Sequence, residues 1–362
     1  MLQLLSVSVT DEFLIRCWCA RGIFLFVIGL YFRGADARLL DILLDLSYGF
    51  MALQHVEIPV PTPKKGEVLV KLEAASVNPV DWKIQSGILR PFLPPKFPYI
   101  PGTDIAGVVV SLGQGVNGFS AGDKVVSWLD LKNGGSFAEY AVASLKYTVK
   151  RPPEVSAVDG SCLPVAGLTA LQSIRDTAGV KLDGSSNANL LVTAASGGVG
   201  LYAVQIAKLG GAHVTATCGA RNIELVKSLG ADEVLDYKTP EGDAMKSPSG
   251  RLYDAVIHCT SGIPFSKFSP NLKPVAKVID LTPNFGSLAT TALKKLTFCK
   301  QQMVPFLMSA NTKDLAFLAD LAKEGKLKTV VDSQHPFSKA EGAWARSKEG
   351  HATGKVVVTF EA

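Results

Sequence analysis

The chain has 362 residues, of which 47% are hydrophobic and 19% are charged, with a net charge of +5 and a pI near 8.7. These values exclude an intrinsically disordered protein and predict a globular chain of two domains. The lysines and arginines are scattered without a long run, so no nucleic acid is expected as a partner, whereas weak attraction to an anionic lipid surface is compatible with the charge.

The first 50 residues, 1–50, form a leader that differs in character from the rest of the chain. They contain the apolar run Gly22–Phe32, flanked by Arg21 and Arg33. A helical bilayer span needs about 20 residues, so this run is short, and its surroundings are atypical of a signal peptide. Three interpretations stay open: a mispredicted first exon, a membrane anchor or signal, and an alternative targeting form.

Residues 51–160 are predicted to form a β-rich domain. A proline-punctuated loop comes first, and apolar and polar residues then alternate from Val68 to Leu72. Such closely spaced strands, joined by glycine turns, suggest a small and strongly bent barrel. Further strands are expected within residues 103–126, 136–144 and 146–152.

A glycine-rich turn follows the short apolar strand Leu190–Ala194. Its pattern is Ala194-x-x-Gly197-x-x-Gly200, and from Leu201 apolar residues recur at helical spacing. Small residues in such a turn let the backbone approach a pyrophosphate, and the N–H groups at the helix start attract its charge. This order of strand, turn and helix predicts nucleotide binding; the alternative is an ordinary tight turn of an α/β protein.

The end of the next strand, His213–Cys218, indicates which dinucleotide is bound. NAD sites usually carry Asp or Glu there, to bind the ribose 2′-OH. Here Cys218 is followed by Gly-Ala-Arg-Asn, so Arg221 is placed to pair with the 2′-phosphate of NADPH. The alternative for Arg221 is a solvated cation, which is disfavoured at a helix N-terminus unless an anion is present.

Helices alternate with strands after Pro164, which predicts a doubly wound parallel sheet over residues 161–305. The tail, residues 306–362, includes strand, helix and strand patterns and is expected to return to the first domain. Helices are expected at 165–178 and 222–232, and strands at 233–237, 253–260 and 276–282.

The cysteines and histidines show no spacing typical of metal ligands, and no C-x-x-C pair occurs. We therefore expect reduced, mostly buried thiols and no metal site. The residues are Cys17, Cys19, Cys162, Cys218, Cys259 and Cys299, and His55, His213, His258, His335 and His351.

Six motifs, spread between Gln54 and Phe360, carry a resemblance to a known family. They read NPVDWKIQSG, PGTDIAGVVVSLGQGVNGFSAGDKVV, LPVAGLTAL, AASGGVG, SLGADEVLDY and GHATGKVVV. In this order they resemble the zinc-independent quinone oxidoreductase branch of the medium-chain dehydrogenase/reductases, and two further segments look like plant members at the chloroplast envelope. The family's first strand, just ahead of the residues that match Leu53, is missing from this pattern.

The resemblance implies an α/β protein with a GroES-like β-rich catalytic domain, a Rossmann doubly wound parallel sheet and a cleft between them. It implies NADPH-dependent reduction of the carbon–carbon double bond of α,β-unsaturated carbonyls, or of quinones. Zinc-dependent relatives carry Gly-His-Glu at the position of Gly102–Asp104. Thr103 replaces the histidine here, so no catalytic metal is expected.

Two catalytic candidates follow from the resemblance, Asn78 and Lys83. Asn78 matches an asparagine near the nicotinamide; the alternative is a turn-forming residue before Pro79. Lys83 stands where several relatives carry tyrosine, and it could donate to an enolate oxygen; the alternative is an exposed loop cation. Asp81 is expected to fix the loop rather than to transfer protons.

The cofactor candidates also come mainly from the resemblance. The turn residues match the family's pyrophosphate site, Thr169 matches a residue near the nicotinamide-side phosphate, and Lys355 matches a tail lysine near the cofactor. Tyr237 matches a residue near the adenosine phosphate, with strand-end packing as the alternative. The full set is Thr169, Ser196, Gly197, Gly198, Val199, Gly200, Cys218, Arg221, Tyr237, Cys259 and Lys355.

Three functions remain in competition: an enone reductase, a quinone reductase, and a membrane-associated NADPH-binding protein with little catalysis. The intact turn, Arg221 and Asn78 favour an enzyme. The expected partner is a small α,β-unsaturated carbonyl or quinone. Peripheral association with the chloroplast inner envelope is implied by the resemblance, and a homodimer is compatible with it.

Overall fold

The computed structural model describes residues 14–21, 52–89, 93 and 99–361 of the chain. The apolar run Gly22–Phe32 lies outside these residues. Strand β1 (Leu14–Arg21) pairs antiparallel with β2 (Ala52–Pro59), so the leader contributes one strand to a two-stranded sheet. The chain is β-structured here, as expected from Leu53 onward, and the proline-punctuated segment begins at the end of β2, because Ala52–Pro59 pairs with β1. No helix among the described residues is long and apolar enough to cross a membrane.

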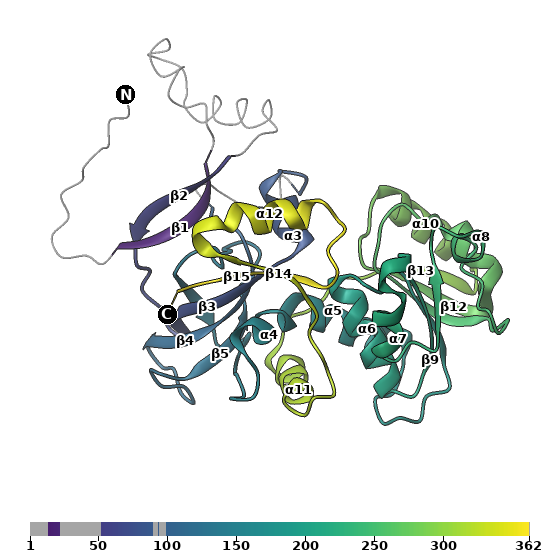
Figure 1. Ribbon diagram of the computed structural model, residues 1–362, viewed down its shortest axis with the longest axis horizontal. Helices are drawn as coiled ribbons and strands as arrows, with labels where there is room; N and C mark the ends of the chain where they lie inside the picture. The colour runs from purple at the N-terminus through teal and green to yellow at the C-terminus, as the bar shows by residue number, and fades with distance from the viewer. Residues whose placement is uncertain (1–13, 22–51, 90–92, 94–98, 362) are drawn as a thin grey trace, which may run out of the picture.

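The first lobe is built on a seven-stranded sheet with the order β14-β15-β3-β4-β5-β7, in which β6 also pairs with β3. Figure 1 shows this lobe beside β1 and β2. Its strands are β3 (Glu67–Val77), β4 (Asp104–Leu112), β5 (Lys124–Trp128), β6 (Tyr140–Ser144), β7 (Thr148–Lys150), β14 (Val331–Pro336) and β15 (Lys355–Thr359).

Strand β3 changes partners along its length. Residues 67–71 pair with β6, whereas residues 74–77 pair with β15, which comes from the end of the chain. The register between β3 and β4 shifts between Leu72 and Ala74, and such irregularities bend a strand. Because of this bend, β3 pairs with β6 in its first half and with β15 in its second half.

The second lobe holds a six-stranded parallel sheet with the order β10-β9-β8-β11-β12-β13. This is the 3-2-1-4-5-6 order of a dinucleotide-binding fold, and it confirms the predicted fold class. The strand β13 was not among the predicted elements. The strands are β8 (Asn189–Val192), β9 (His213–Cys218), β10 (Glu233–Asp236), β11 (Tyr253–His258), β12 (Leu272–Asp280) and β13 (Gln301–Pro305).

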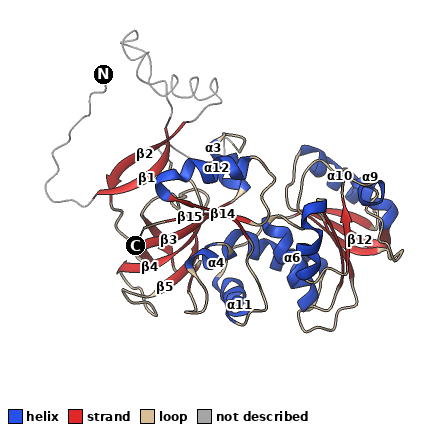
Figure 2. Ribbon diagram, viewed as in Figure 1, coloured by secondary structure: helices blue, strands red, loops and turns tan. Residues whose placement is uncertain are grey.

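Helices flank the second sheet, as Figure 2 shows. The longest are α6 (Gly198–Leu209), which follows the glycine turn, and α10 (Phe285–Leu296), which lies against β13. Neither α10 nor α11 (Thr312–Lys323) was predicted. The short helices are α7 (Ile223–Ser228), α8 (Pro240–Asp243) and α9 (Phe265–Phe268).

A helical segment joins the two lobes. It comprises α4 (Ala157–Ser161), α5 (Leu168–Gln172) and the π-helical turns at 163–167 and 173–178, and α4 and α5 lie between the lobes in Figure 1. The hydrophobic core is continuous across this junction, because Ala106 and Val126 of the first sheet cluster with Leu168 and with Ile257 of the second. Burial of this shared apolar surface holds the lobes together.

The tail packs on both lobes. Helix α11 is fixed to the joining segment by Asp314, which accepts hydrogen bonds from Arg175 at 2.6 Å and Gln172 at 2.9 Å. Burial raises the pKa of Asp314, but hydrogen bonds from Arg175, Asn311 and Gln172 outweigh it and bring the pKa to about 2. Helices α12 (Ala340–Lys348) and α3 (Pro79–Gln85) pack together over the first sheet.

Candidate active site

A buried chain of polar side chains lies where the first sheet meets the glycine turn. Lys355, at the start of β15, donates from Nζ to Oδ1 of Asn78 at 2.5 Å. Asn78 donates from Nδ2 to Oδ2 of Asp104 at 2.8 Å. The three residues are 4%, 2% and 0% exposed. Because lysine only donates and a carboxylate only accepts, the Asn78 amide is held in one orientation.

Asp104 anchors this chain to the segment that joins the two lobes. Its carboxylate accepts from Ser76 Oγ at 2.9 Å and from the Val165 backbone N–H at 3.1 Å. Ser76 lies on β3, and Val165 lies in the first π-helical turn of the joining segment. In the sequence, Gly102–Asp104 was notable only as the place where a metal motif is absent, so the role of Asp104 was missed. The signal available in the sequence was an acidic residue directly before the mostly apolar run 105–110.

A second buried carboxylate, Asp81, lies in the first turn of α3, three residues after Asn78. Its Oδ2 accepts from the Asn78 backbone N–H at 2.7 Å, which fixes the loop that carries Asn78. Burial raises the pKa of Asp81 to about 7; the nearby Asp104 carboxylate adds to this shift, and the hydrogen bond from Asn78 opposes it. Burial also raises the pKa of Asp104, against the opposing effect of Lys355. The site therefore contains an acid that titrates near neutral pH.

The tail brings Lys355 against the glycine turn. The Gly354 N–H donates to the carbonyl of Ser196 at 2.9 Å, and Gly354 forms a bridge with Gly197. A Cβ placed on Gly198 would lie 2.8 Å from Cδ of Lys355, so the lysine stem runs along the backbone of the turn. The turn, Lys355 and Asn78 thus form one continuous site.

The turn itself has the shape that a pyrophosphate requires. Ala194 has a positive φ of 47°, which starts the reversal of the chain. A Cβ on Gly200 would lie 2.5 Å from the Ala194 carbonyl oxygen, so only glycine lets the helix approach the strand this closely. No side chain caps α6, whose first N–H groups are suited to a phosphate. The residues present therefore fit a dinucleotide.

Arg221, which the sequence predicts to bind the 2′-phosphate, is hydrogen-bonded to the tail. Arg221 lies exposed in a 3-10 turn after β9, and its Nη2 donates to the His351 carbonyl at 2.7 Å. Next to it, Thr353 donates to the Asn222 side chain at 3.3 Å. Cys218 is buried at the end of β9, and the Tyr237 ring lies 3.6 Å from a Cβ placed on Gly219. These residues surround the strand end that the sequence assigned to the adenosine.

Among the described residues, no hydrogen bond joins the polar chain to three other candidates. Lys83 is two residues after Asp81 on α3, and positions i and i+2 of a helix point to different faces. Its Nζ lies 5.8 Å from the ring of Trp82. Thr169 is buried on α5, and Cys259 follows β11, with burial raising the pKa of its thiol to about 12. Lys355 is therefore the lysine that bonds Asn78, and no hydrogen bond joins Lys83 to Asn78 among the described residues.

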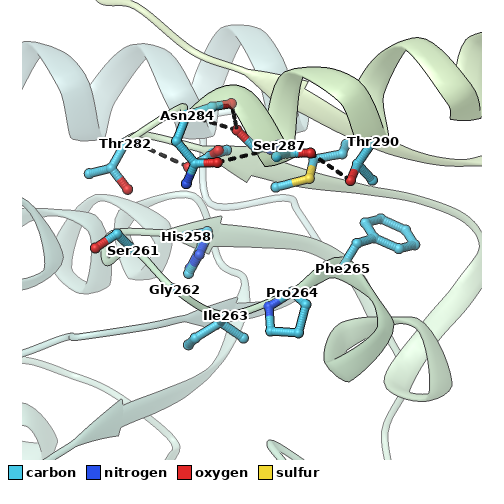
Figure 3. Close-up of a pocket in the computed structure, with 13 residues that line it drawn as sticks. His258, Ser261, Gly262, Ile263, Pro264, Phe265, Thr282, Asn284, Ser287 and Thr290 are labelled. Atoms are coloured by element: carbon cyan, nitrogen blue, oxygen red, sulfur yellow. Dashed lines mark hydrogen bonds between the residues drawn. The ribbon is translucent and has the colours of Figure 1, made fainter.

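A separate cavity of about 270 Å³ lies at the carboxyl ends of β11 and β12 (Figure 3). His258 forms part of its wall and holds Thr193 Oγ1 at 3.1 Å from Nδ1. Burial lowers the pKa of His258, which favours the neutral ring. The inner face of α10 supplies Ser287 and Thr290 to the same cavity. The polar chain around Asn78 does not line it.

Two family models match the sequence. The alcohol dehydrogenase GroES-like domain matches residues 64–153, and the zinc-binding dehydrogenase family matches residues 229–358. The donor set at Asn78 does not fit a zinc ion. Thr103 stands in the motif where zinc-dependent relatives carry histidine, the ammonium of Lys355 would repel a cation, and the described residues contain no metal-binding group of three or more His, Cys, Asp or Glu.

Curated relatives and solved structures agree with these family models. The chain is 64% identical over 311 residues to the chloroplast envelope quinone oxidoreductase homolog of Arabidopsis thaliana, covering 86% of this chain and 94% of that protein. It is 32% identical to the NADPH-dependent alkenal/one oxidoreductase, chloroplastic, of the same plant, covering 86% and 77%. The quinone oxidoreductase structure from Coxiella burnetii superposes with a TM-score of 0.78 at 26% identity, covering 96% of this chain and all of that one.

Two glycine substitutions should separate folding from cofactor binding. Gly200→Ala places a Cβ against backbone atoms, so we expect a loss of about 1–3 kcal/mol in the free energy of unfolding. Gly197→Ala meets only the Ala194 carbonyl oxygen, at 3.3 Å, so its stability should change by less than about 1 kcal/mol. Its affinity for NADPH should nevertheless fall about tenfold, because the methyl obstructs the pyrophosphate. Denaturant unfolding measures the stability of each variant, and titration with NADPH measures its affinity. A Gly197→Ala variant that binds NADPH as tightly as the wild type would contradict the assignment of the turn as the pyrophosphate site.

The raised pKa of Asp81 predicts a pH-dependent stability. Below pH 4 this acid is protonated in both states; from about pH 4 to 7 it ionises only in the unfolded chain, so stability falls as the pH rises. Asp81→Asn removes this dependence. The difference in the free energy of unfolding between the variant and the wild type should shift in favour of the variant by about 2–4 kcal/mol from pH 4 to pH 8. Exposed Asp320→Asn is the control, and equal pH profiles for Asp81→Asn and the wild type would refute the prediction.

Proposed function

The chain belongs to the medium-chain dehydrogenase/reductase superfamily and is an oxidoreductase, and from this premise we propose that it is a zinc-independent, NADPH-dependent reductase of the C=C bond of α,β-unsaturated carbonyls. The observation that carries the proposal is the buried Lys355–Asn78–Asp104 chain, which lies directly against the dinucleotide turn. It supplies N–H donors and a positive charge where a reducible carbonyl would meet the cofactor.

The residues support this chemistry as follows. NADPH, when bound, would supply a hydride to the β-carbon. Negative charge would develop on the carbonyl oxygen of the substrate, and the α-carbon would take up a proton from water or a nearby acid. Lys355 brings a buried ammonium, which stabilises such charge more strongly than an exposed one does. Asp104 and Asp81 fix the Asn78 side chain and backbone, so these donors need little rearrangement during the reaction.

The cofactor assignment rests on the turn and on Arg221. The alkenal/one oxidoreductase relative is named as NADPH-dependent, which agrees with a guanidinium, and not a carboxylate, after β9. We further propose that, when the cofactor binds, Arg221 releases the His351 carbonyl and donates to the 2′-phosphate. A charged acceptor makes the stronger hydrogen bond. Thr169, Tyr237 and Cys259 remain proposed cofactor contacts, and Lys83 remains a proposed catalytic residue.

Quinone reduction is the second candidate, because the 64% identical relative is named a quinone oxidoreductase homolog. The names of that relative and of the alkenal/one oxidoreductase favour a chloroplast location. Peripheral contact with the inner envelope is proposed from the family resemblance. A homodimer is proposed as well, and the edge of β13 that pairs with no described strand is compatible with it.

Turnover by the full-length protein tests the reductase proposal. NADPH consumption should be fast with a medium-chain enone or a lipid-derived ketone and slow with a quinone, and Asn78→Ala should lower kcat about 100-fold. Selective turnover of the quinone would move the assignment to the second candidate. Tight NADPH binding without turnover on any of these acceptors would indicate a binding protein.

Arg221→Ala tests the cofactor preference separately. Removing a charge-assisted pair with the 2′-phosphate should raise the KM for NADPH about tenfold or more while leaving the KM for NADH unchanged. Arg251→Ala, an exposed arginine of the same lobe, is the matched control. An equal effect on both cofactors would place Arg221 outside the 2′-phosphate site.

A further inference from the structure

The cavity of about 270 Å³ between the second sheet and the start of α10 is built like a ligand site (Figure 3). Its volume is at the small end of ligand pockets and suits a molecule of one or two rings. None of the residues proposed for catalysis or for NADPH lines it. Its apolar lining comes from Ile263, Pro264, Phe265 and Met303.

Several polar groups of this cavity already have partners within the protein. The Thr290 hydroxyl donates to the Gly286 carbonyl at 2.8 Å. The Thr282 hydroxyl donates to the Thr260 carbonyl, also at 2.8 Å. A ligand gains little from donors that are already satisfied in its absence.

Two buried side chains of the wall are different, His258 at the end of β11 and Asp280 at the end of β12. They are directly paired across the two parallel strands, so they stand side by side on one face of the sheet. Each is 2% exposed, and both line the cavity. Oδ1 of Asp280 accepts from the Thr282 N–H at 3.0 Å, whereas no described residue donates to Oδ2 or forms an ion pair with this carboxylate.

The hydrogen bonds of Thr193 determine which group His258 presents to the cavity. The Thr193 hydroxyl oxygen accepts from the Cys259 N–H at 3.0 Å and lies 3.1 Å from Nδ1 of His258. Among the described residues, Nδ1 is the only acceptor that this hydroxyl meets, so the hydroxyl donates to it. Burial lowers the pKa of His258, so the ring is neutral and carries its one proton on Nε2. The wall therefore offers an N–H donor beside a carboxylate acceptor.

A neutral hydroxyl group is the ligand chemistry that matches this pair. An anion would be repelled by Asp280, and a cation would face the N–H of His258. A hydroxyl oxygen both donates and accepts, so one group can satisfy both side chains. The apolar lining suits an aromatic ring that carries the hydroxyl. We propose that the cavity beneath α10 is a second ligand site, which binds a small neutral phenol with its hydroxyl between His258 and Asp280.

This site goes beyond the reductase proposal and does not depend on it. The Lys355–Asn78–Asp104 chain and the glycine turn contribute no residue to the cavity. NADPH and the phenol should therefore bind at the same time, and the loss of one should leave the other.

Equilibrium dialysis of the full-length protein against 2-naphthol at neutral pH tests the proposal. The matched probe is 2-methoxynaphthalene, which keeps the two rings and the oxygen but has no proton to donate. The wild type should bind 2-methoxynaphthalene about tenfold or more weakly than 2-naphthol, because Asp280 then lacks a charge-assisted hydrogen bond. Saturating NADPH should change the affinity for 2-naphthol less than about twofold, as expected for uncoupled sites.

Variants of the cavity wall provide an independent arm. Asp280→Asn keeps an oxygen for the Thr282 N–H but removes the charged acceptor, so the affinity for 2-naphthol should fall about tenfold or more. His258→Phe removes the N–H donor, and the affinity should fall about threefold or more. The matched control is Thr290→Val, which removes a lining hydroxyl that is already bonded within α10 and should change the affinity less than about twofold. Asn78→Ala should leave it unchanged as well.

Thermal unfolding and NADPH binding are measured on every variant, so a loss of fold is distinguished from a loss of the phenol site. If Asp280→Asn does not fold, the contrast between the two probes on the wild type still decides. The proposal is overturned if the wild type binds no 2-naphthol or binds both probes equally, or if folded Asp280→Asn binds 2-naphthol as tightly as the wild type. Displacement of 2-naphthol by NADPH would assign the cavity to the cofactor and would overturn it too.

Discussion

The hydrogen bond between Lys355 and Asn78 is the constraint on which the site depends. It places Lys355 of the tail against Asn78, which follows β3 of the first sheet, and both against the dinucleotide turn. An ammonium group buried this deeply is stable only with acceptors and neighbouring negative charge, which Asn78 and Asp104 provide. The topology of β3, β4 and β15 brings these side chains together.

The electrostatic balance of the site rests on three buried charged groups of the chain itself. Two carboxylates and one ammonium occupy a region that water does not reach. Asp104 stays close to Lys355, whereas burial brings the pKa of Asp81 to about 7, so the net charge of the group changes near neutral pH. The positive charge of the group belongs to Lys355, at a fixed position of β15.

Local patterns predicted many of the elements, but not β13, α10 or α11, and not the contacts between distant segments. The turn from Ala194 to Gly200 and the parallel strands followed from spacing and composition, because those signals depend on neighbours in the sequence. The Arg221–His351 contact and the Asp104–Val165 contact join segments 130 and 61 residues apart, and no local pattern encodes them. Helix α10 is a different case. Its apolar residues recur at helical spacing, but in the structure they face outward and not toward the core.

The partner change along β3 has a consequence for biosynthesis. Residues 74–77 find their strand partner β15 only at the end of translation, so the nascent first sheet carries an open edge while the whole second lobe is made. The same late strand delivers Lys355 and the Gly354 bridge. A nascent chain can therefore contain the glycine turn before the tail supplies Lys355 and the Gly354 bridge to it.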